Sequence, residues 1–269
     1  MRIYHPPMPL HGAERENSYI VQDMAGVELG QGWLQAVVDR ENWPDRPLRL
    51  ALYMDAHPAA RDTLYGALMA RAGQLYALYG RAPGCVTARC HPNDIQLLYF
   101  YQQMGFDTSD GEELFQWDLA PDEKPFFPPI GTQMVDTLLS GREDMAALLA
   151  RVNRYSDQPH EIEWLLEAAD LPYFMACGVY NGTDCLGEAL VTGAEGEASL
   201  EMLYTVPAWR RHHVATALLL GVKAQLIRRG ARVLRVRQPR SNRAAVAMMQ
   251  LQGFVWMGTL EVRPTKDIP

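Results

Sequence analysis

Residues 209–220 read WRRHHVATALLL, a run of two arginines and two histidines that leads directly into an apolar segment. The first backbone N–H groups of a helix lack intrahelical partners, and the helix dipole favours negative charge there. A pyrophosphate could accept hydrogen bonds from these amides and from nearby cations. The turn lacks glycine, which most easily permits a positive φ and a close backbone approach. The alternative interpretation is the basic, solvated start of an ordinary helix.

Composition limits the classes of protein to consider. The chain has 269 residues, of which 48% are hydrophobic, so it can form one large or two modest domains. Its net charge of −7 argues against nucleic acid as the main partner, because duplex binding favours a basic surface. We expect no membrane span and no signal peptide, because the long apolar segments that they need are missing.

The chain holds four cysteines, Cys85, Cys90, Cys177 and Cys185, without the CxxC spacing of metal or redox motifs. Reduced thiols in a cytoplasmic protein are the simplest interpretation, and we expect no bound metal.

A proline-rich segment, LAPDEKPFFPPIG at 119–131, shows neither helical nor strand periodicity. We predict a domain boundary near residue 125, which gives domains 1–124 and 125–269. Before it, the pattern predicts strands at 47–55, 85–90 and 113–119 and helices at 59–79 and 94–104. After it, the pattern predicts helices at 142–154, 159–169, 214–229 and 243–252, and strands at 173–181, 185–193, 197–206, 233–238 and 255–263.

The two halves repeat the same markers in the same order. The pairs are Arg61 and Arg210, Gly80 and Gly230, Asn93 and Asn242, and Gly105 and Gly253, separated by 148 to 150 residues. Agreement of four ordered markers predicts an internal duplication.

The order of these elements, with LEMLYTVPAWRRHHVATALL and NRAAVAMMQLQGF, resembles the GNAT superfamily of acyl-CoA-dependent N-acyltransferases. The family turn is [RQ]-x-x-G-x-[GA], and Arg210 and Ala215 fit it while His213 replaces the first glycine. Histidine tolerates a positive φ better than a β-branched residue does. Asn242, Ala245 and the Gly-Phe pair at 253–254 match a later family pattern. The resemblance covers 140–263 well and 18–119 faintly.

The resemblance implies an α+β fold with two GNAT-like domains, each a mixed, mostly antiparallel sheet flanked by helices. It implies an N-acetyltransferase that uses acetyl-CoA to acetylate a primary amine of a small molecule or a peptide. Glu201 would be the base and Tyr204 a candidate acid. Leu203, Tyr204 and Thr205 would pair through their backbones with the pantetheine arm. The remaining cofactor-binding residues would be Arg210, Arg211, His212, His213, Val214, Ala215, Thr216, Asn242 and Ala245.

The general acid is an open point. Met249 occupies the position of the tyrosine that serves the family as acid, and methionine cannot donate a proton. Tyr204 could substitute, water could protonate the thiolate, or catalysis could be weak; Tyr204 could equally be a packed core aromatic. Glu201 could instead be an exposed or salt-bridged strand residue. Glu188 could line the acceptor pocket or be exposed.

Against the family pattern that the second half matches, the first half is a degenerate copy. Its equivalent turn, PAARDTLYGALM, has Tyr65 at the small-residue position and a negative charge at Asp62. We therefore expect one working site, in the second half. The alternatives are a CoA-binding or sensing protein without turnover, and a scaffold. The acidic net charge mildly favours cationic acceptors, whereas the sequence fixes neither the acceptor nor the oligomeric state.

Overall fold

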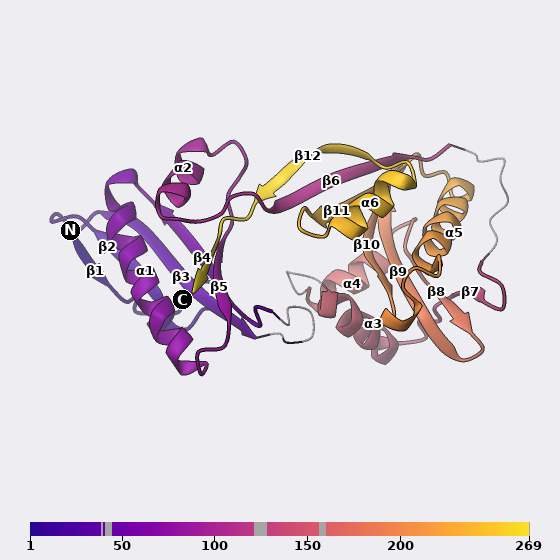
Figure 1. Cartoon of the computed structure of the whole chain (residues 1–269), viewed down its shortest axis with the longest axis horizontal. Helices are drawn as coiled ribbons and strands as arrows, with labels where there is room; N and C mark the ends of the chain where they lie inside the picture. The colour runs from indigo at the N-terminus through magenta and orange to yellow at the C-terminus, as the bar shows by residue number, and fades with distance from the viewer. Residues whose placement is uncertain (39, 41–44, 121–127, 156–159, 269) are drawn as a thin grey trace. The chain divides into compact units, whose positions relative to one another are not determined.

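The computed structural model describes residues 1–38, 40, 45–120, 128–155 and 160–268 (Figure 1). The chain forms two compact units, Met1–Glu112 together with Thr259–Pro269, and Glu113–Gly258. The predicted boundary between residues 124 and 125 lies outside the described residues.

The first unit is built on a sheet whose strands, over the described residues, follow the order β1-β2-β3-β4-β5-β13. Strands β4 and β5 are parallel and the other neighbours are antiparallel. Helix α1 (Pro58–Leu78) packs Leu64 and Leu68 against Leu34 and Leu50 of the sheet, and α2 (Ile95–Gln103) adds Tyr101 to the same core. The strands are β1 (Arg2–Tyr4), β2 (Ser18–Gln22), β3 (Glu28–Val38), β4 (Leu48–Ala56), β5 (Gly84–Ala88) and β13 (Thr265–Ile268).

The second sheet follows the order β12-β6-β11-β10-β9-β8-β7 over the described residues, with helices on both faces (Figure 1). Its strands are β6 (Gly111–Asp118), β7 (Gln133–Asp136), β8 (Met175–Asn181), β9 (Asp184–Ala194), β10 (Glu197–Thr205), β11 (Val233–Pro239) and β12 (Val255–Val262). Its helices are α3 (Arg142–Tyr155), α4 (Ile162–Ala169), α5 (Val214–Arg228) and α6 (Arg243–Leu251).

Two separate apolar cores cover the two faces of this sheet. On one face, Leu218 of α5 and Met249 of α6 pack with Leu200 of β10. On the other, Leu148 of α3 and Leu165 of α4 pack with Leu190 and Met202. The predicted α+β fold class, with mixed and mostly antiparallel sheets flanked by helices, is confirmed.

Two strands belong to a different sheet from the strands that precede them in the chain. The predicted strand at 113–119 forms as β6, but it lies between β11 and β12 of the second sheet. Strand β13 pairs antiparallel with β5, so residues 265–268 complete the first sheet (Figure 1). A period of two residues identifies a strand and its faces but not its neighbours, which is why the sequence predicted β6 without its partners.

The internal repeat is visible in how the shorter helices begin and end. Asp94 caps α2 with φ −82° and ψ 70°, and Asn242 caps α6 with φ −79° and ψ 64°. After each helix a glycine with positive φ, Gly105 or Gly253, reverses the chain. The sequence paired Asn93 with Asn242, and this pairing is wrong by one residue. Asp94 is the equivalent residue, because the cap must accept a bond from an amide of the first turn.

Candidate active site

Strands β10 and β11 separate part of the way along their length. They pair in parallel from Glu197 and Val233 as far as Leu200 and Val236, while β10 continues to Thr205 and β11 to Pro239. Residues 202–205 of β10 still pair with β9 on the other side. The edge of β10 that faces β11 therefore offers backbone N–H and C=O groups to an extended ligand arm.

Glu201 lies where this opening starts. Leu200 pairs with Val191 and Met202 with Leu190, so Glu201 is the extra residue of a β-bulge. Bulges redirect a side chain and often lie beside active sites. Thr192 Oγ1 donates a hydrogen bond of 2.8 Å to Glu201 Oε1 and so fixes the half-buried carboxylate.

Tyr204 belongs to a polar cluster on the face of the sheet that α3 covers. It lies directly opposite Glu188, and its hydroxyl donates to Glu188 Oε2 over 3.2 Å. Arg151 Nε donates to the same oxygen over 2.7 Å. Burial and the charge of Glu188 raise the pKa of Tyr204, so the phenol stays protonated at neutral pH. Of the two alternatives for Glu188, the exposed one is wrong, because its exposed fraction is 4%.

The basic segment that follows β10 is a turn and not a helix start. Residues Pro207–Trp209 form a 3-10 turn, after which Arg211 adopts φ 65° and His213 φ 62° with ψ 13°. Helix α5 begins at Val214, so the predicted helix start is confirmed, and His213 holds the left-handed conformation for which the family uses glycine. The amides of Val214, Ala215 and Thr216 belong to the first helical turn, which has no intrahelical partners for them.

Thr205, the final residue of β10, has an unusual hydroxyl. Among the described residues, Thr205 Oγ1 is the one buried side-chain polar atom that lacks a hydrogen-bond partner. Buried polar groups are nearly always paired, so this hydroxyl is available for a hydrogen bond to a ligand. It lies at the mouth of the opening, two residues before the turn.

The remaining predicted residues lie on the β11 side of the opening. Asn242 Oδ1 accepts from the Ala245 amide over 3.3 Å and so caps α6, and its Nδ2 donates to Gln238 Oε1 over 3.4 Å. Met249, at the usual position of the acid, is fully buried in the core with Leu218. Within the described residues, no group of three or more potential metal ligands occurs.

Sequence reasoning missed two residues of the site. Thr192 lies on the neighbouring strand, and only the register that the bulge sets brings it to Glu201. Arg151 lies on α3, and no local pattern connects it to Glu188. Alternation along β9 could have placed Glu188, Leu190 and Thr192 on one face, but not their partners.

The equivalent region of the first unit is different. Strand β4 pairs with β5 from Leu48 to Leu52 and then continues alone on that side to Ala56. Unlike β10 with β9, however, β4 pairs with β3 without a bulge. Leu52 is the last residue of β4 that pairs with β5, as Leu200 is the last residue of β10 that pairs with β11, so the bulged Glu201 has no counterpart in β4. The segment interpreted as an equivalent turn, PAARDTLYGALM, is helical from Pro58 onwards, so that interpretation is wrong. Arg61 Nε donates to Ala56 O over 3.3 Å and caps the strand edge.

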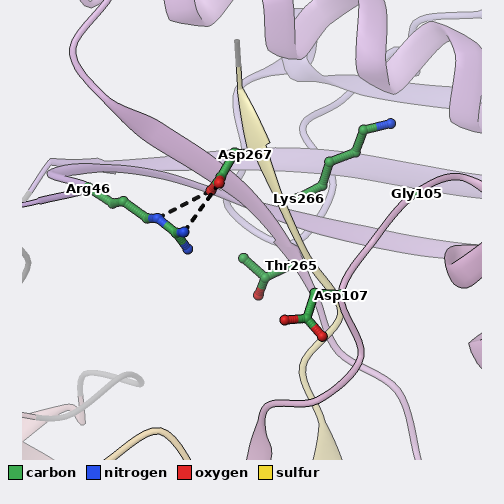
Figure 2. A pocket seen from close by; sticks show the side chains of 6 residues that line it. All are labelled: Arg46, Gly105, Asp107, Thr265, Lys266 and Asp267. Carbon is green, nitrogen blue, oxygen red and sulfur yellow. Dashed lines mark hydrogen bonds and ion pairs between the residues drawn. The ribbon is translucent and has the colours of Figure 1, made fainter.

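A separate charged hollow of about 400 Å³ occurs in the first unit (Figure 2). Figure 2 shows Arg46 paired with Asp267, and both side chains are more than half exposed. The hollow contains none of the predicted site residues, and its lining residues are Arg46, Gly105, Asp107, Thr265, Lys266 and Asp267.

Comparison with known proteins places this geometry in context. Residues 142–254 match the acetyltransferase (GNAT) family. No curated protein sequence matches the chain. None of the described helices is both long and apolar enough to cross a membrane.

Several solved structures share the fold. A GCN5-related N-acetyltransferase from Sphaerobacter thermophilus aligns at 16% identity and a TM-score of 0.54, over 96% of this chain and 82% of its own. A probable N-acyltransferase from Enterococcus faecalis V583 aligns at 11% identity and a TM-score of 0.57, over 93% of this chain and 61% of its own. Eis1 from Mycobacterium abscessus aligns at 13% identity and a TM-score of 0.52, over 94% and 64%. The residues that match the family, 142–254, contain the bulge, the turn and α5. Over these residues the chain carries a GNAT acetyltransferase domain.

Proposed function

We propose that this protein transfers the acetyl group of acetyl-CoA to a primary amine of a small molecule or a peptide, at one site in the second unit. The observation that carries the proposal is the arrangement around β10. A bulged glutamate stands at one end of an open strand edge, and a left-handed turn and a helix N-terminus stand at the other.

The binding roles follow from the groups that this arrangement leaves available. The backbones of Leu203, Tyr204 and Thr205 would pair with the amides of the pantetheine arm in the manner of an added strand. The diphosphate would bind the first-turn amides of α5, where Ala215 is small enough for close approach. Arg210, Arg211, His212 and His213 are exposed at this turn and would supply positive charge, and Asn242 and Ala245 would border the opening from α6.

The chemistry requires a neutral amine and a proton for the leaving thiolate. Glu201, held by Thr192, would accept the proton of the amine directly or through water. The amine nitrogen then attacks the thioester carbonyl carbon, the C–N bond forms, and the C–S bond breaks to release the thiolate of CoA. The four free thiols of the chain suit a reducing compartment, and we propose a cytoplasmic location.

The source of the second proton is constrained by the contacts of Tyr204. The sequence made Tyr204 a candidate acid, and its raised pKa keeps a proton on the phenol. That O–H donates to Glu188, however, and transfer of its proton would leave a phenolate beside a carboxylate. We therefore propose that water protonates the thiolate and that Tyr204 forms a wall of the acceptor side.

The differences between the two units support a single site. The first unit has no bulge in β4 that could present a residue like Glu201, and Arg61 occupies the carbonyl of Ala56 at the end of that strand. Its helix also begins at Pro58 without a left-handed turn, and Tyr65 packs there against Phe106.

The test combines binding with turnover. Calorimetry should give one acetyl-CoA site per chain, and thiol release should appear with at least one amine of a broad panel. Glu201→Gln should keep the affinity for acetyl-CoA and lower turnover by about 10²–10⁴-fold. Glu197→Gln is the matched control, because Glu197 lies on the same strand, pairs with Arg235 and is half exposed. Two equivalent sites, or unchanged turnover in Glu201→Gln, would contradict the proposal.

One observation favours a second function. Met249 is buried at the position of the family acid, which suits a protein that binds acyl-CoA and responds to it without turnover. Tight binding of acetyl-CoA with no thiol release from any amine would support this alternative.

A further inference from the structure

Arg151 and Glu188 form an ion pair on the face of the sheet that α3 covers. Arg151 Nε lies 2.7 Å from Glu188 Oε2, and the exposed fractions of the two side chains are 36% and 6%. The carboxylate is therefore buried, whereas part of the guanidinium reaches the surface. A buried carboxylate needs such a partner, because an unpaired buried charge is strongly destabilising.

The contacts of Arg151 leave one edge of its guanidinium available. Nε is bound to Glu188, and Nη1 donates to Ala147 O over 3.2 Å. Within the described part of the chain, Nη2 has no hydrogen-bond partner. The guanidinium is planar and its donors have a fixed geometry, so the two bonds also fix the direction of the free edge. Glu188 thus orients Arg151 and leaves it able to bind a second anion.

Arg151 and the proposed base share one face of the sheet. Glu188, Leu190 and Thr192 are every second residue of β9 and so lie on one face of the sheet. On this face Leu190 packs with α3 and α4, and Thr192 contacts Glu201. Tyr204, the cross-strand partner of Glu188, is three residues beyond Glu201, which is about 10 Å along a strand. Arg151 bonds the same oxygen of Glu188 to which Tyr204 donates, so the guanidinium lies at the Tyr204 end of this stretch and Glu201 lies at the other end.

We infer that Arg151 binds a carboxylate of the acceptor, so that the acceptor is a primary amine that also carries a carboxylate, such as an amino acid. This inference rests on the proposed function. A carboxylate matches the guanidinium edge in geometry and charge. Burial and Glu188 raise the pKa of both Tyr180 and Tyr204, so these neighbours are neutral and do not repel an anion. The buried Glu188 is the less accessible member of the pair, which argues against an ammonium site.

The experiment compares amino acids with the amines that lack only the carboxylate. The pairs are alanine and ethylamine, lysine and 1,5-diaminopentane, and phenylalanine and 2-phenylethylamine. The wild-type protein should acetylate at least one amino acid with a kcat/KM about tenfold or more above that of its amine, which corresponds to about 1.4 kcal/mol. Arg151→Gln should remove this preference by raising KM for the amino acid about 10–100-fold, with the KM for acetyl-CoA unchanged.

Two further variants separate recognition from folding. Arg142→Gln lies on the same helix and removes an exposed pair with Glu163, so it should leave every rate unchanged. Arg151→Lys keeps the charge but not the fork, and it should restore part of the preference. It also replaces Arg151→Gln in the comparison if the glutamine variant does not fold.

The outcomes distinguish this inference from the proposed function. Acetylation of amines but not of amino acids, or an equal loss for both members of a pair in Arg151→Gln, would overturn the inference and leave the proposed function standing. If no acceptor releases thiol, the proposed function fails. Calorimetry with the three amino acids then decides the role of Arg151: weaker binding in Arg151→Gln supports it, and absent or unchanged binding refutes it.

Discussion

The unpaired hydroxyl of Thr205 allows a test in which stability and ligand affinity change in opposite directions. Thr205→Val keeps the shape and the branched Cβ of the side chain and removes Oγ1, the buried atom without a partner. Leaving a buried polar group unpaired costs about 1–3 kcal/mol. The free energy of unfolding of the valine variant should therefore exceed that of the ligand-free wild type by about 1 kcal/mol or more. If the hydroxyl bonds to bound acetyl-CoA, the variant loses about 0.5–1.5 kcal/mol of binding. That loss corresponds to roughly 2–12-fold weaker affinity.

The measurements are urea unfolding without ligand, followed by circular dichroism, and calorimetric titration with acetyl-CoA. Thr192→Val is the matched control, because its hydroxyl is buried like that of Thr205 but is bonded to Glu201. That control should lose stability where Thr205→Val gains it. A ligand-free Thr205→Val protein that is less stable than wild type would refute the reasoning about the unpaired atom. Unchanged affinity for acetyl-CoA would refute its role in the site.

Three other predictions follow from the two units and their thiols. Ala215→Glu should abolish acetyl-CoA binding in calorimetry with the ligand-free melting temperature nearly unchanged, since a helix N-terminus accepts an acid. Tyr65→Glu should leave the affinity intact. Normal binding by Ala215→Glu would refute the diphosphate-binding role of the turn. Deleting residues 1–124 removes β6 from inside the second sheet, so this protein should lose its near-ultraviolet circular dichroism; a folded fragment would contradict the strand order. Burial raises the pKa of Cys90 and Cys177 to about 12, so at pH 8 their thiolate fraction is about a thousandth of that of a free thiol. Alkylation of these two thiols should be correspondingly slow until the pH or the denaturant concentration is raised. Rapid labelling of the native protein would disprove their burial.

Local chemistry made the helices and the turn around the candidate site predictable. Periodicity and glycine stops gave α1 and α5 to within a residue or two, because an apolar stripe and a left-handed C-terminal residue are both encoded in neighbouring positions. The sequence placed His213 at the position of the family glycine as a residue that tolerates a positive φ, and in the structure its φ is 62°. The order of motifs also predicts which segment binds the cofactor, and that assignment stays a prediction.

The rest depends on contacts between distant segments. The bond from Thr192 to Glu201 exists only because a bulge shifts the register by one residue, and no single strand encodes that shift. The pair of Arg151 and Glu188 joins a helix to a strand 37 residues away. The single-residue error at Asn93 has the same origin, since the cap is identified by the amide that it accepts from.

The placement of β13 has a consequence for how the chain folds as it is synthesised. Strand β5 pairs with residues that follow it by roughly 180 positions in the chain. At about 5–20 residues per second, the ribosome needs roughly 10–40 s to supply that partner. During this interval the nascent first unit presents β5 as an uncovered strand, the kind of edge that templates unwanted pairing with other chains. Ribosome-bound chains should therefore depend on chaperones over this interval, and slow codons after β5 should increase aggregation more than slow codons before it.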